Sequence, residues 1–222
     1  MSSNIKAVIF DLDGTLADTL WEIREGVNNT RAELGLPPAS YDDVKNGLNV
    51  GVRHLVKTTV ADPARADDEE YINDVQRRYV AAYGKVFHKT EKPYDGVYET
   101  VMALKNKGIK LAVLSNKPDQ FVKVLSAKLL GDDTFCVLRG PVEGGARKPD
   151  PALTLEVLGC ISKDIKPSEC AFVGDSNVDI ETAKNAGMYS VAVTWGYRDR
   201  AFLEKYIPDM IIDSPDELLK LF

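Results

Sequence analysis

The sequence predicts an α/β fold in which a parallel sheet is covered by helices and interrupted by one helical insertion. Short apolar runs alternate with longer helical patterns, which is typical of parallel strands joined by crossover helices. Residues 16–93 break this alternation, because they contain helical patterns but no convincing strand pattern. The alternation therefore indicates one sheet-containing core, and the interruption indicates an insertion directly after the first strand.

The strands of this core are predicted from six short apolar runs. A parallel sheet is buried on both faces, so its strands consist almost entirely of apolar residues and do not alternate with polar ones. The six runs are Ala7–Phe10, Lys110–Leu114, Phe135–Leu138, Cys170–Val173, Ser190–Val193 and Met210–Ile212.

Helical patterns lie between and after these runs. Gly108 and Gly187 each follow a helical pattern, as C-terminal caps do. Ser214 and Pro215 combine a capping residue with a proline at the first helical position. The predicted helices are Tyr98–Lys107, Phe121–Leu130, Pro151–Leu158, Ile180–Ala186 and Pro215–Leu221.

The insertion contains three helical stretches. The first is indicated by apolar residues between Trp21 and Leu34, the second begins near Ser40, and the third covers Asp67–Val86. We therefore predict an α/β core domain of residues 1–15 and 94–222 and a helical cap domain of residues 16–93. The alternative is a helical extension of the same core. A cap that closes over the strand ends would exclude water from a site there.

Composition favours a globular protein with an ordinary core. The 222 residues are 44% hydrophobic and 28% charged, and the net charge of −6 argues against nucleic acid or an anionic membrane as the main partner. Neither a secretory signal nor an apolar stretch of the ~20 residues that a membrane span needs is recognisable, so a cytoplasmic location is expected. The three cysteines form no CxxC pattern and are expected to be small buried residues in a reducing compartment.

Polar residues follow the apolar runs at the points where the strands end. Asp11, Asp13 and Gly14 follow the first run, and two carboxylates this close repel each other unless a cation or a shared proton relieves them. Gly14 permits a sharp turn because it has no Cβ. Further along the chain come Ser115-Asn116, Lys148-Pro149 and the segment Gly174–Asp179.

These polar residues are expected to converge, because the carboxyl ends of parallel strands lie at one edge of the sheet. Together they provide a carboxylate nucleophile, a hydroxyl group, a lysine and further acids. Phosphoryl transfer through an aspartyl-phosphate needs this set of groups. A divalent cation offsets the repulsion between an anionic nucleophile and a phosphate, while lysine and hydroxyl donors hold the phosphoryl oxygens.

The order of these motifs resembles the haloacid dehalogenase-like hydrolase superfamily, and specifically its phosphatases. DLDGT, the serine after the second strand, the Lys-Pro pair and GDSNVD occur in that order over nearly the full chain. DLDGTLADT, GDSNVDIETAKNAGM and VTWGY are most similar to the phosphoglycolate phosphatase-type branch, and Asp13 separates the chain from true dehalogenases. The resemblance implies a Rossmann-like core, Mg²⁺ and hydrolysis of a small phosphate monoester.

The resemblance also implies roles for individual residues. Asp11 is expected to be the nucleophile, Asp13 the general acid and base, and Lys148 the group that neutralises Asp11 and the phosphoryl group. Asp11, Asp175 and the backbone carbonyl of Asp13 are expected to hold Mg²⁺. Asp179 is expected to orient metal-bound water or Lys148, although an acid at a helix N-terminus also has a purely structural interpretation.

The expected substrate-binding residues are Ser115, Asn116, Thr15 and Arg53. Ser115 would donate to a phosphoryl oxygen, and Asn116 and Thr15 would contribute backbone amides. Arg53, in the insertion, would contact a substrate carboxylate through its two-pronged guanidinium group. The competing interpretations are a simple helix cap for Ser115 and a solvated helix residue for Arg53.

Two other functions share these motifs. A phosphosugar mutase similar to β-phosphoglucomutase would return the phosphoryl group to the bound sugar. A non-hydrolytic signalling or binding protein would keep a stable phospho-aspartate, but the insertion and the chain length argue against a receiver domain. The expected partner is a small phosphate ester, and a monomer and a homodimer are both compatible with the sequence.

Overall fold

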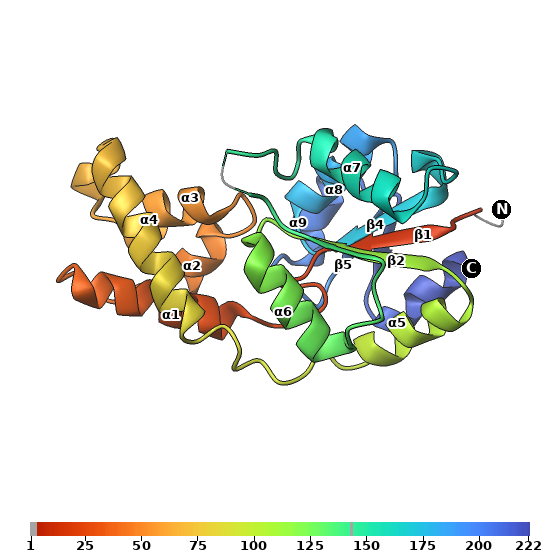
Figure 1. Cartoon of the computed structure of the whole chain (residues 1–222), viewed down its shortest axis with the longest axis horizontal. Helices are drawn as coiled ribbons and strands as arrows, with labels where there is room; N and C mark the ends of the chain where they lie inside the picture. Colours follow the sequence, from red (N-terminus) through yellow and green to blue (C-terminus); the bar gives the residue numbers. More distant parts are fainter. Residues whose placement is uncertain (1–3, 143) are drawn as a thin grey trace. The chain divides into compact units, whose positions relative to one another are not determined.

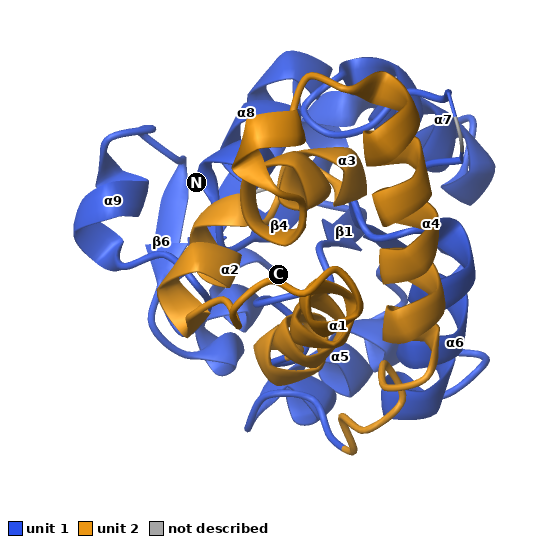
Figure 2. Ribbon diagram, turned by 90° about the vertical axis from the view of Figure 1, so that its left-hand side faces the viewer, with its two compact units in different colours: residues 1–18, 92–222 blue, residues 19–91 orange. Residues whose placement is uncertain are grey.

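The computed structural model describes residues 4–142 and 144–222, which divide into two compact units. Unit 1 consists of Met1–Asp18 and Lys92–Phe222, and unit 2 consists of Thr19–Glu91 (Figure 2). These boundaries lie within three residues of those expected from the sequence. The function of unit 2 as a cap stays a prediction.

Unit 1 is built on a six-stranded parallel sheet with the strand order β3-β2-β1-β4-β5-β6 (Figure 1). The predicted fold class is confirmed, because every pair of neighbouring strands is parallel and helices cover the sheet. The strands are β1 (Ala7–Phe10), β2 (Lys110–Leu114), β3 (Val137–Arg139), β4 (Cys170–Gly174), β5 (Tyr189–Val193) and β6 (Met210–Ile212).

Both faces of this sheet are covered, and alternate residues of each central strand serve opposite faces. In β1, Val8 and Phe10 pack with helices α5 and α6, whereas Ala7 and Ile9 pack with α7 on the other face. This arrangement explains why the strands are apolar throughout. The α-helices of unit 1 are α5 (Val97–Asn106), α6 (Asp119–Leu130), α7 (Pro151–Ile161), α8 (Asn177–Ala186) and α9 (Arg200–Glu204).

The structure differs from the sequence prediction at three elements of unit 1. Strand β3 begins at Val137, two residues later than predicted, where it pairs with Ala112 of β2. The segment Pro215–Leu221 forms a 3-10 helix (η4) instead of an α-helix, and the side chain of Ser214 does not cap it. Helix α9 was not predicted, because its five residues are too few to show a clear period.

Unit 2 is entirely helical among its described elements, as predicted. Its second helix begins at a capping box, in which Ser40 and Asp43 each bond to the other's backbone amide. This pair accounts for the helix start that the sequence indicated. The α-helices are α1 (Leu20–Glu33), α2 (Tyr41–Gly47), α3 (Val52–Leu55) and α4 (Glu69–Gly84), with a π-helical turn at Val56–Val60 and a 3-10 turn at Pro63–Arg65.

The segments of unit 1 that lead into and out of unit 2 are joined to each other. The backbone N–H of Tyr94 donates to the carbonyl oxygen of Leu16 at 3.0 Å. Leu16 is buried and Tyr94 packs against the same apolar cluster of unit 1. The chain therefore leaves this core and returns to it at neighbouring points.

The three cysteines do not all follow the prediction. Cys170 is buried in β4, but Cys136 and Cys160 are exposed, so the expectation of burial is wrong for these two. Cys136 precedes the edge strand β3, and Cys160 lies on an outer position of α7. None of the helices in the described ranges is long and apolar enough to cross a membrane.

The core of unit 1 gives a direct test of this packing. Leu104 of α5 is fully buried, and replacing it by alanine should lower the free energy of unfolding by about 2–5 kcal/mol, because it removes apolar contacts and leaves a cavity. Urea unfolding would measure the change. Leu155→Ala, at a position that is 42% exposed on α7, is the control and should have little effect. Equal effects of the two variants would contradict this account of the core.

Candidate active site

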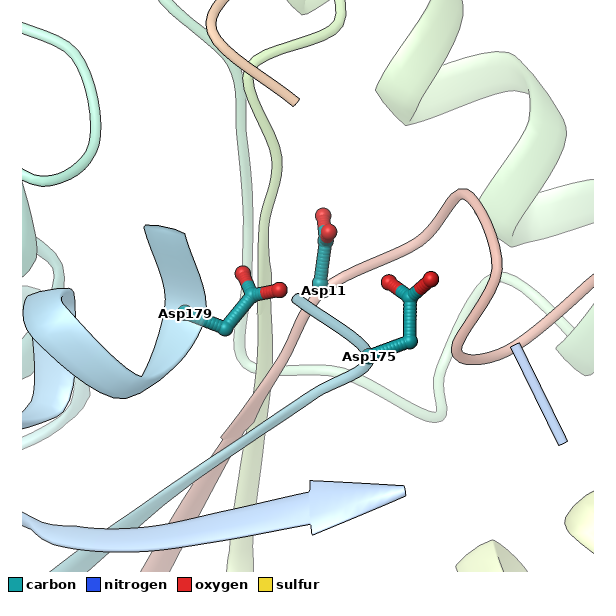
Figure 3. A group of neighbouring side chains, drawn as sticks. All are labelled: Asp11, Asp175 and Asp179. Carbon is teal, nitrogen blue, oxygen red and sulfur yellow. The ribbon is translucent and has the colours of Figure 1, made fainter. Parts of the chain in front are cut away.

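A cluster of buried carboxylates lies where the strand order of the sheet reverses. Strand β1 lies between β2 and β4, and Asp11 and Asp175 directly follow β1 and β4. In open α/β sheets, ligands bind beyond the carboxyl ends of the strands at such a reversal. Figure 3 shows the carboxylates of Asp11, Asp175 and Asp179 gathered in one place, and one carboxylate oxygen from each lies within 4.8 Å of the others.

Two glycines allow the surrounding loops to approach Asp175 closely. Gly14 has φ = +80°, a conformation that favours glycine, and a Cβ there would overlap the Asp175 carboxylate. A Cβ on Gly196 would overlap both the Asp175 side chain and the Gly14 carbonyl oxygen. The loops after β1 and β5 therefore enclose this carboxylate only because these positions lack side chains.

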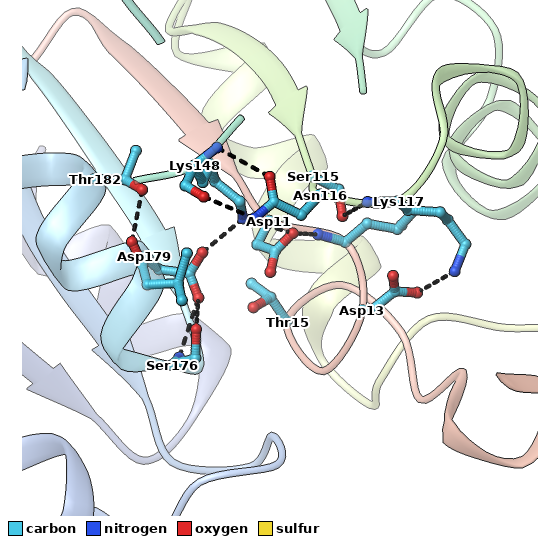
Figure 4. A network of polar contacts seen from close by, with 12 residues as sticks. Asp11, Asp13, Thr15, Ser115, Asn116, Lys117, Lys148, Ser176, Asp179 and Thr182 are labelled. Carbon is cyan, nitrogen blue, oxygen red and sulfur yellow. Dashed lines mark hydrogen bonds and ion pairs between the residues drawn. The ribbon is translucent and has the colours of Figure 1, made fainter. Parts of the chain in front are cut away.

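Lys148 provides the positive charge at the centre of the cluster. Its ammonium group lies 2.9 Å from Asp11 Oδ1 and 2.7 Å from Asp179 Oδ1, and the lysine side chain is only 2% exposed (Figure 4). The sequence placed Lys148 in a loop, and the structure brings it from the segment after β3 to the end of β1. An acid and a lysine from distant parts of the chain thus form a buried ion pair.

Asn116 fixes the backbone from which Lys148 projects. Its side-chain amide donates to the Lys148 carbonyl oxygen and accepts from the Lys148 N–H, both at 2.9 Å. The sequence suggested only a backbone contribution from Asn116 and missed this clamp. The two hydrogen bonds hold the loop after β3 against the loop after β2.

The Asp175 carboxylate is oriented by the loops on either side of it. Its Oδ2 accepts from the Tyr197 N–H at 2.7 Å, and its Oδ1 accepts from the Thr15 hydroxyl at 3.4 Å. The carbonyl oxygen of Thr15 in turn accepts from the indole N–H of Trp195 at 3.0 Å. The side chain of Thr15 is thus directed at Asp175, whereas the sequence suggested a backbone contact with substrate.

Both oxygens of Asp179 are engaged in this network. Oδ1 bonds Lys148, and Oδ2 accepts from the Ser176 hydroxyl at 2.7 Å and from its N–H at 3.1 Å. These contacts combine a capping box at the start of α8 with an ion pair in the site. Asp179 is therefore well placed to orient Lys148.

Burial of Asp11 and Asp175 strongly favours the protonated forms of these two acids. Removal from water is the largest cause and raises the pKa of Asp11 from 3.8 to about 7; Lys148 opposes this rise, while Asp179 adds to it. The pKa of Asp175 is also raised well above its usual value, by burial first and then by Asp179 and Asp11. For Lys148, burial lowers the pKa, but the two acids outweigh burial and raise it.

Asp13 faces a second lysine, which sequence reasoning did not identify. Asp13 Oδ1 lies 2.7 Å from Lys117 Nζ, with the two side chains 14% and 4% exposed. Lys117 directly follows Asn116, and its N–H donates to the Ser115 hydroxyl oxygen at 3.3 Å. A lysine next to two candidate site residues was the only signal available in the sequence.

Arg53 belongs to unit 2, where its side chain contacts two residues of helix α4. The guanidinium group pairs with Glu69 and donates to Asn73 Oδ1 at 2.8 Å, both on α4. Lys57 pairs with the same glutamate at 3.0 Å. The guanidinium group is thus oriented by α4. Its contact with a substrate carboxylate stays a prediction.

The acid cluster fits a divalent metal ion. Asp11, Asp175 and Asp179 offer three carboxylates around one ammonium group, so the charge of Lys148 does not compensate for all of them. Carboxylate and carbonyl oxygens are the ligands that Mg²⁺, Ca²⁺ and Mn²⁺ prefer. A bound cation would supply the missing positive charge.

The chain belongs to a known enzyme family. The family model for haloacid dehalogenase-like hydrolases matches residues 5–187, which include both aspartates of the first motif, Lys148 and Asp175. The resemblance inferred from the motifs is thereby confirmed.

Its relatives are phosphatases by name. The chain is 34% identical over 217 residues to phosphoglycolate phosphatase of Aquifex aeolicus, covering 98% of this chain and 96% of that protein. It is 31% identical to N-acetylmuramic acid 6-phosphate phosphatase of Pseudomonas aeruginosa, covering 97% and 93%. The crystal structure of a predicted phosphoglycolate phosphatase from Haemophilus somnus 129pt has a TM-score of 0.88 and 30% identity, covering 100% of this chain and 99% of that one.

The raised pKa values predict how stability depends on pH in the absence of metal. Folded Asp11 binds its proton more tightly than the unfolded chain does, so its contribution to the free energy of unfolding falls as pH rises from about 4 to 7. Asp175 acts in the same direction. Adding Mg²⁺ at pH 7.5 should therefore raise the melting temperature by about 2–4 °C for each kcal/mol gained. Thermal melts with Mg²⁺ and with a chelator would measure this.

Removal of one acid tests the cause of this effect. Asp175→Asn should melt higher than the wild type when metal is absent, and Mg²⁺ should no longer stabilise it. The control Asp164→Asn replaces an exposed aspartate after α7 and should preserve the Mg²⁺ effect. An undiminished Mg²⁺ effect in Asp175→Asn would show that the cation binds elsewhere.

Proposed function

We propose that the protein is a Mg²⁺-dependent phosphatase that hydrolyses a small phosphate monoester through an aspartyl-phosphate on Asp11. The observation that carries this proposal is the buried ion pair between Asp11 and Lys148 beside Asp175. A carboxylate at the end of β1 with an adjacent ammonium group and an acid cluster has the groups that phosphoryl transfer to an enzyme needs.

Asp11 is held ready for attack on phosphorus. Its Oδ1 accepts from the Leu12 N–H at 2.7 Å and contacts Lys148, so its orientation is fixed before substrate arrives. In the first step a carboxylate oxygen of Asp11 bonds to phosphorus while the bond from phosphorus to the ester oxygen breaks. Asp13 gives a proton to that oxygen, which leaves as an alcohol.

The second step releases phosphate and restores the enzyme. A water oxygen attacks phosphorus, Asp13 takes a proton from that water, and the bond between phosphorus and Asp11 breaks. Lys148 remains beside the phosphoryl group in both steps, where its charge stabilises the oxygens. Ser115, buried at the end of β2, is proposed to donate to one of them.

Mg²⁺ would be held by Asp11, Asp175 and the backbone carbonyl of Asp13. When bound, it neutralises the charge of the phosphate and polarises its oxygens. We assign Asp179 the role of orienting Lys148, because its Oδ1 accepts from Lys148 while its Oδ2 is held by Ser176. Thr15 orients Asp175 in the same way.

The leading substrate candidate is 2-phosphoglycolate, and N-acetylmuramic acid 6-phosphate is the second. These esters appear in the names of the relatives from Aquifex aeolicus and Pseudomonas aeruginosa. Both compounds carry a carboxylate in addition to the phosphate ester, which suggests a cationic side chain for recognition. We propose that unit 2 acts as a cap and that Arg53 supplies this cation.

A screen of phosphate esters with Asp11→Asn as its reference tests the proposed function. Wild type should release phosphate from 2-phosphoglycolate and from p-nitrophenyl phosphate only when Mg²⁺ is present. Asp11→Asn should lose turnover, because the amide is nearly the same shape but a poor nucleophile. A single cooperative melting transition no more than about 5 °C below that of the wild type would show that this variant is folded.

Three outcomes would refute this function. Full hydrolysis by Asp11→Asn would remove the aspartyl-phosphate step. Slow phosphate release that depends on a sugar bisphosphate primer would identify a mutase instead. A stable phosphoprotein without turnover of any ester would indicate a signalling protein.

The proposed role of Arg53 is tested by comparing a substrate that carries a carboxylate with one that does not. Arg53→Met should raise KM for 2-phosphoglycolate by ~10- to 100-fold, which is the effect expected from losing a hydrogen bond between charged groups. The KM for p-nitrophenyl phosphate should not change. Lys57→Met is the matched control, because Lys57 pairs with the same Glu69. If both variants leave KM unchanged, Arg53 is only a structural partner of α4.

A further inference from the structure

Lys117 is a buried lysine with no assigned role in the steps described above. Its side chain is 4% exposed, and its ammonium group lies 2.7 Å from Asp13 Oδ1. Exposed ion pairs contribute little to stability, and burying a charge costs free energy unless a partner compensates it. A lysine buried at this place is therefore expected to have a role other than keeping the protein soluble. Its partner is Asp13, the proposed general acid.

The backbone around Lys117 is built to hold the residue in place. Its N–H donates to the Ser115 hydroxyl oxygen, and a Cβ on Gly140 would overlap the Lys117 carbonyl oxygen. The Gly140 N–H also donates to Asp119 Oδ1 at 3.0 Å, which ties the loop after β3 to the start of α6. The loops after β2 and β3 thus fix the position from which the lysine side chain extends.

The two buried lysines of the site form ion pairs with different acids. Lys148 contacts Asp11 and Asp179, whereas Lys117 contacts Asp13 (Figure 4). The Asp13 side chain is attached to a turn that Gly14 allows, and it is more exposed than the Asp11 side chain, at 14% against 5%. A partner that fixes its direction therefore matters more for Asp13 than for the enclosed nucleophile.

We propose that Lys117 is a positioning residue that orients the Asp13 carboxyl group for proton transfer to the leaving oxygen. This inference rests on the proposed function, in which the ester bond breaks as Asp13 releases its proton to the departing alkoxide. The ammonium group holds one oxygen of Asp13, and that contact sets the direction of the other oxygen. It also balances the negative charge that Asp13 gains when its proton leaves.

The test compares leaving groups that do and do not need a proton. Nitrophenolate departs as a stable anion, whereas an alkoxide must be protonated as it leaves. Values of kcat/KM, which report steps up to the first irreversible one, would be measured for Lys117→Met with p-nitrophenyl phosphate, ethyl phosphate and 2-phosphoglycolate. Both alkyl esters should lose ~10- to 100-fold, and the aryl ester less than about threefold. Asp13→Asn should show the same selectivity with larger losses.

The other outcomes would overturn the inference. Equal losses for all three esters, together with a lower melting temperature, would make Lys117 a structural residue. A loss confined to 2-phosphoglycolate would mean that Lys117 binds the substrate carboxylate directly. Lys123→Met, which removes a half-exposed lysine of the neighbouring helix α6, is the control and should leave all three values unchanged. Absence of turnover by wild type with every ester would instead refute the proposed function.

Discussion

Three carboxylates gathered around one ammonium group, out of contact with water, are the arrangement on which the rest of this structure depends. Burial opposes ionisation of Asp11 and Asp175, and the single charge of Lys148 does not compensate for three acids. The fold offsets part of this cost with backbone dipoles, because the N–H groups of Leu12 and Tyr197 donate to these carboxylates. Charge that remains uncompensated gives such a site its affinity for a cation.

The sheet makes this arrangement possible by bringing distant segments together. Asp11 and Asp175 follow adjacent strands, and Lys148 reaches them from the loop beyond β3, where Asn116 clamps its backbone. Polar side chains hold one another across these loops, so that each loop position depends on its neighbours. Loss of any one clamp is therefore expected to disturb the site more than the fold, since the fold is supported by the apolar faces of the sheet.

Much of this could be predicted from the sequence because its signals are local. Strands buried on both faces consist of apolar residues, so β1, β2 and β6 cover the predicted residues. Asp11, Lys148 and Asp175 were found because their motifs occur in the order typical of the family and because the topology places the strand ends at one edge of the sheet. The pair of Lys117 with Asp13 was missed because its members lie 104 positions apart and a lysine after Ser-Asn also suits an ordinary helix entry. Exposure of Cys136 depends on β3 being an edge strand, which composition does not reveal.

The hydrogen bond between Tyr94 and Leu16 has a consequence for how this family diversifies. Because the backbone leaves the sheet domain and re-enters it at adjacent points, the length and sequence of the intervening segment are not constrained by the geometry of β1. An inserted unit with neighbouring ends can be lengthened, shortened or exchanged at little conformational cost to its host. New substrate preferences could then evolve in the insertion while the chemical machinery of the host domain stays unchanged.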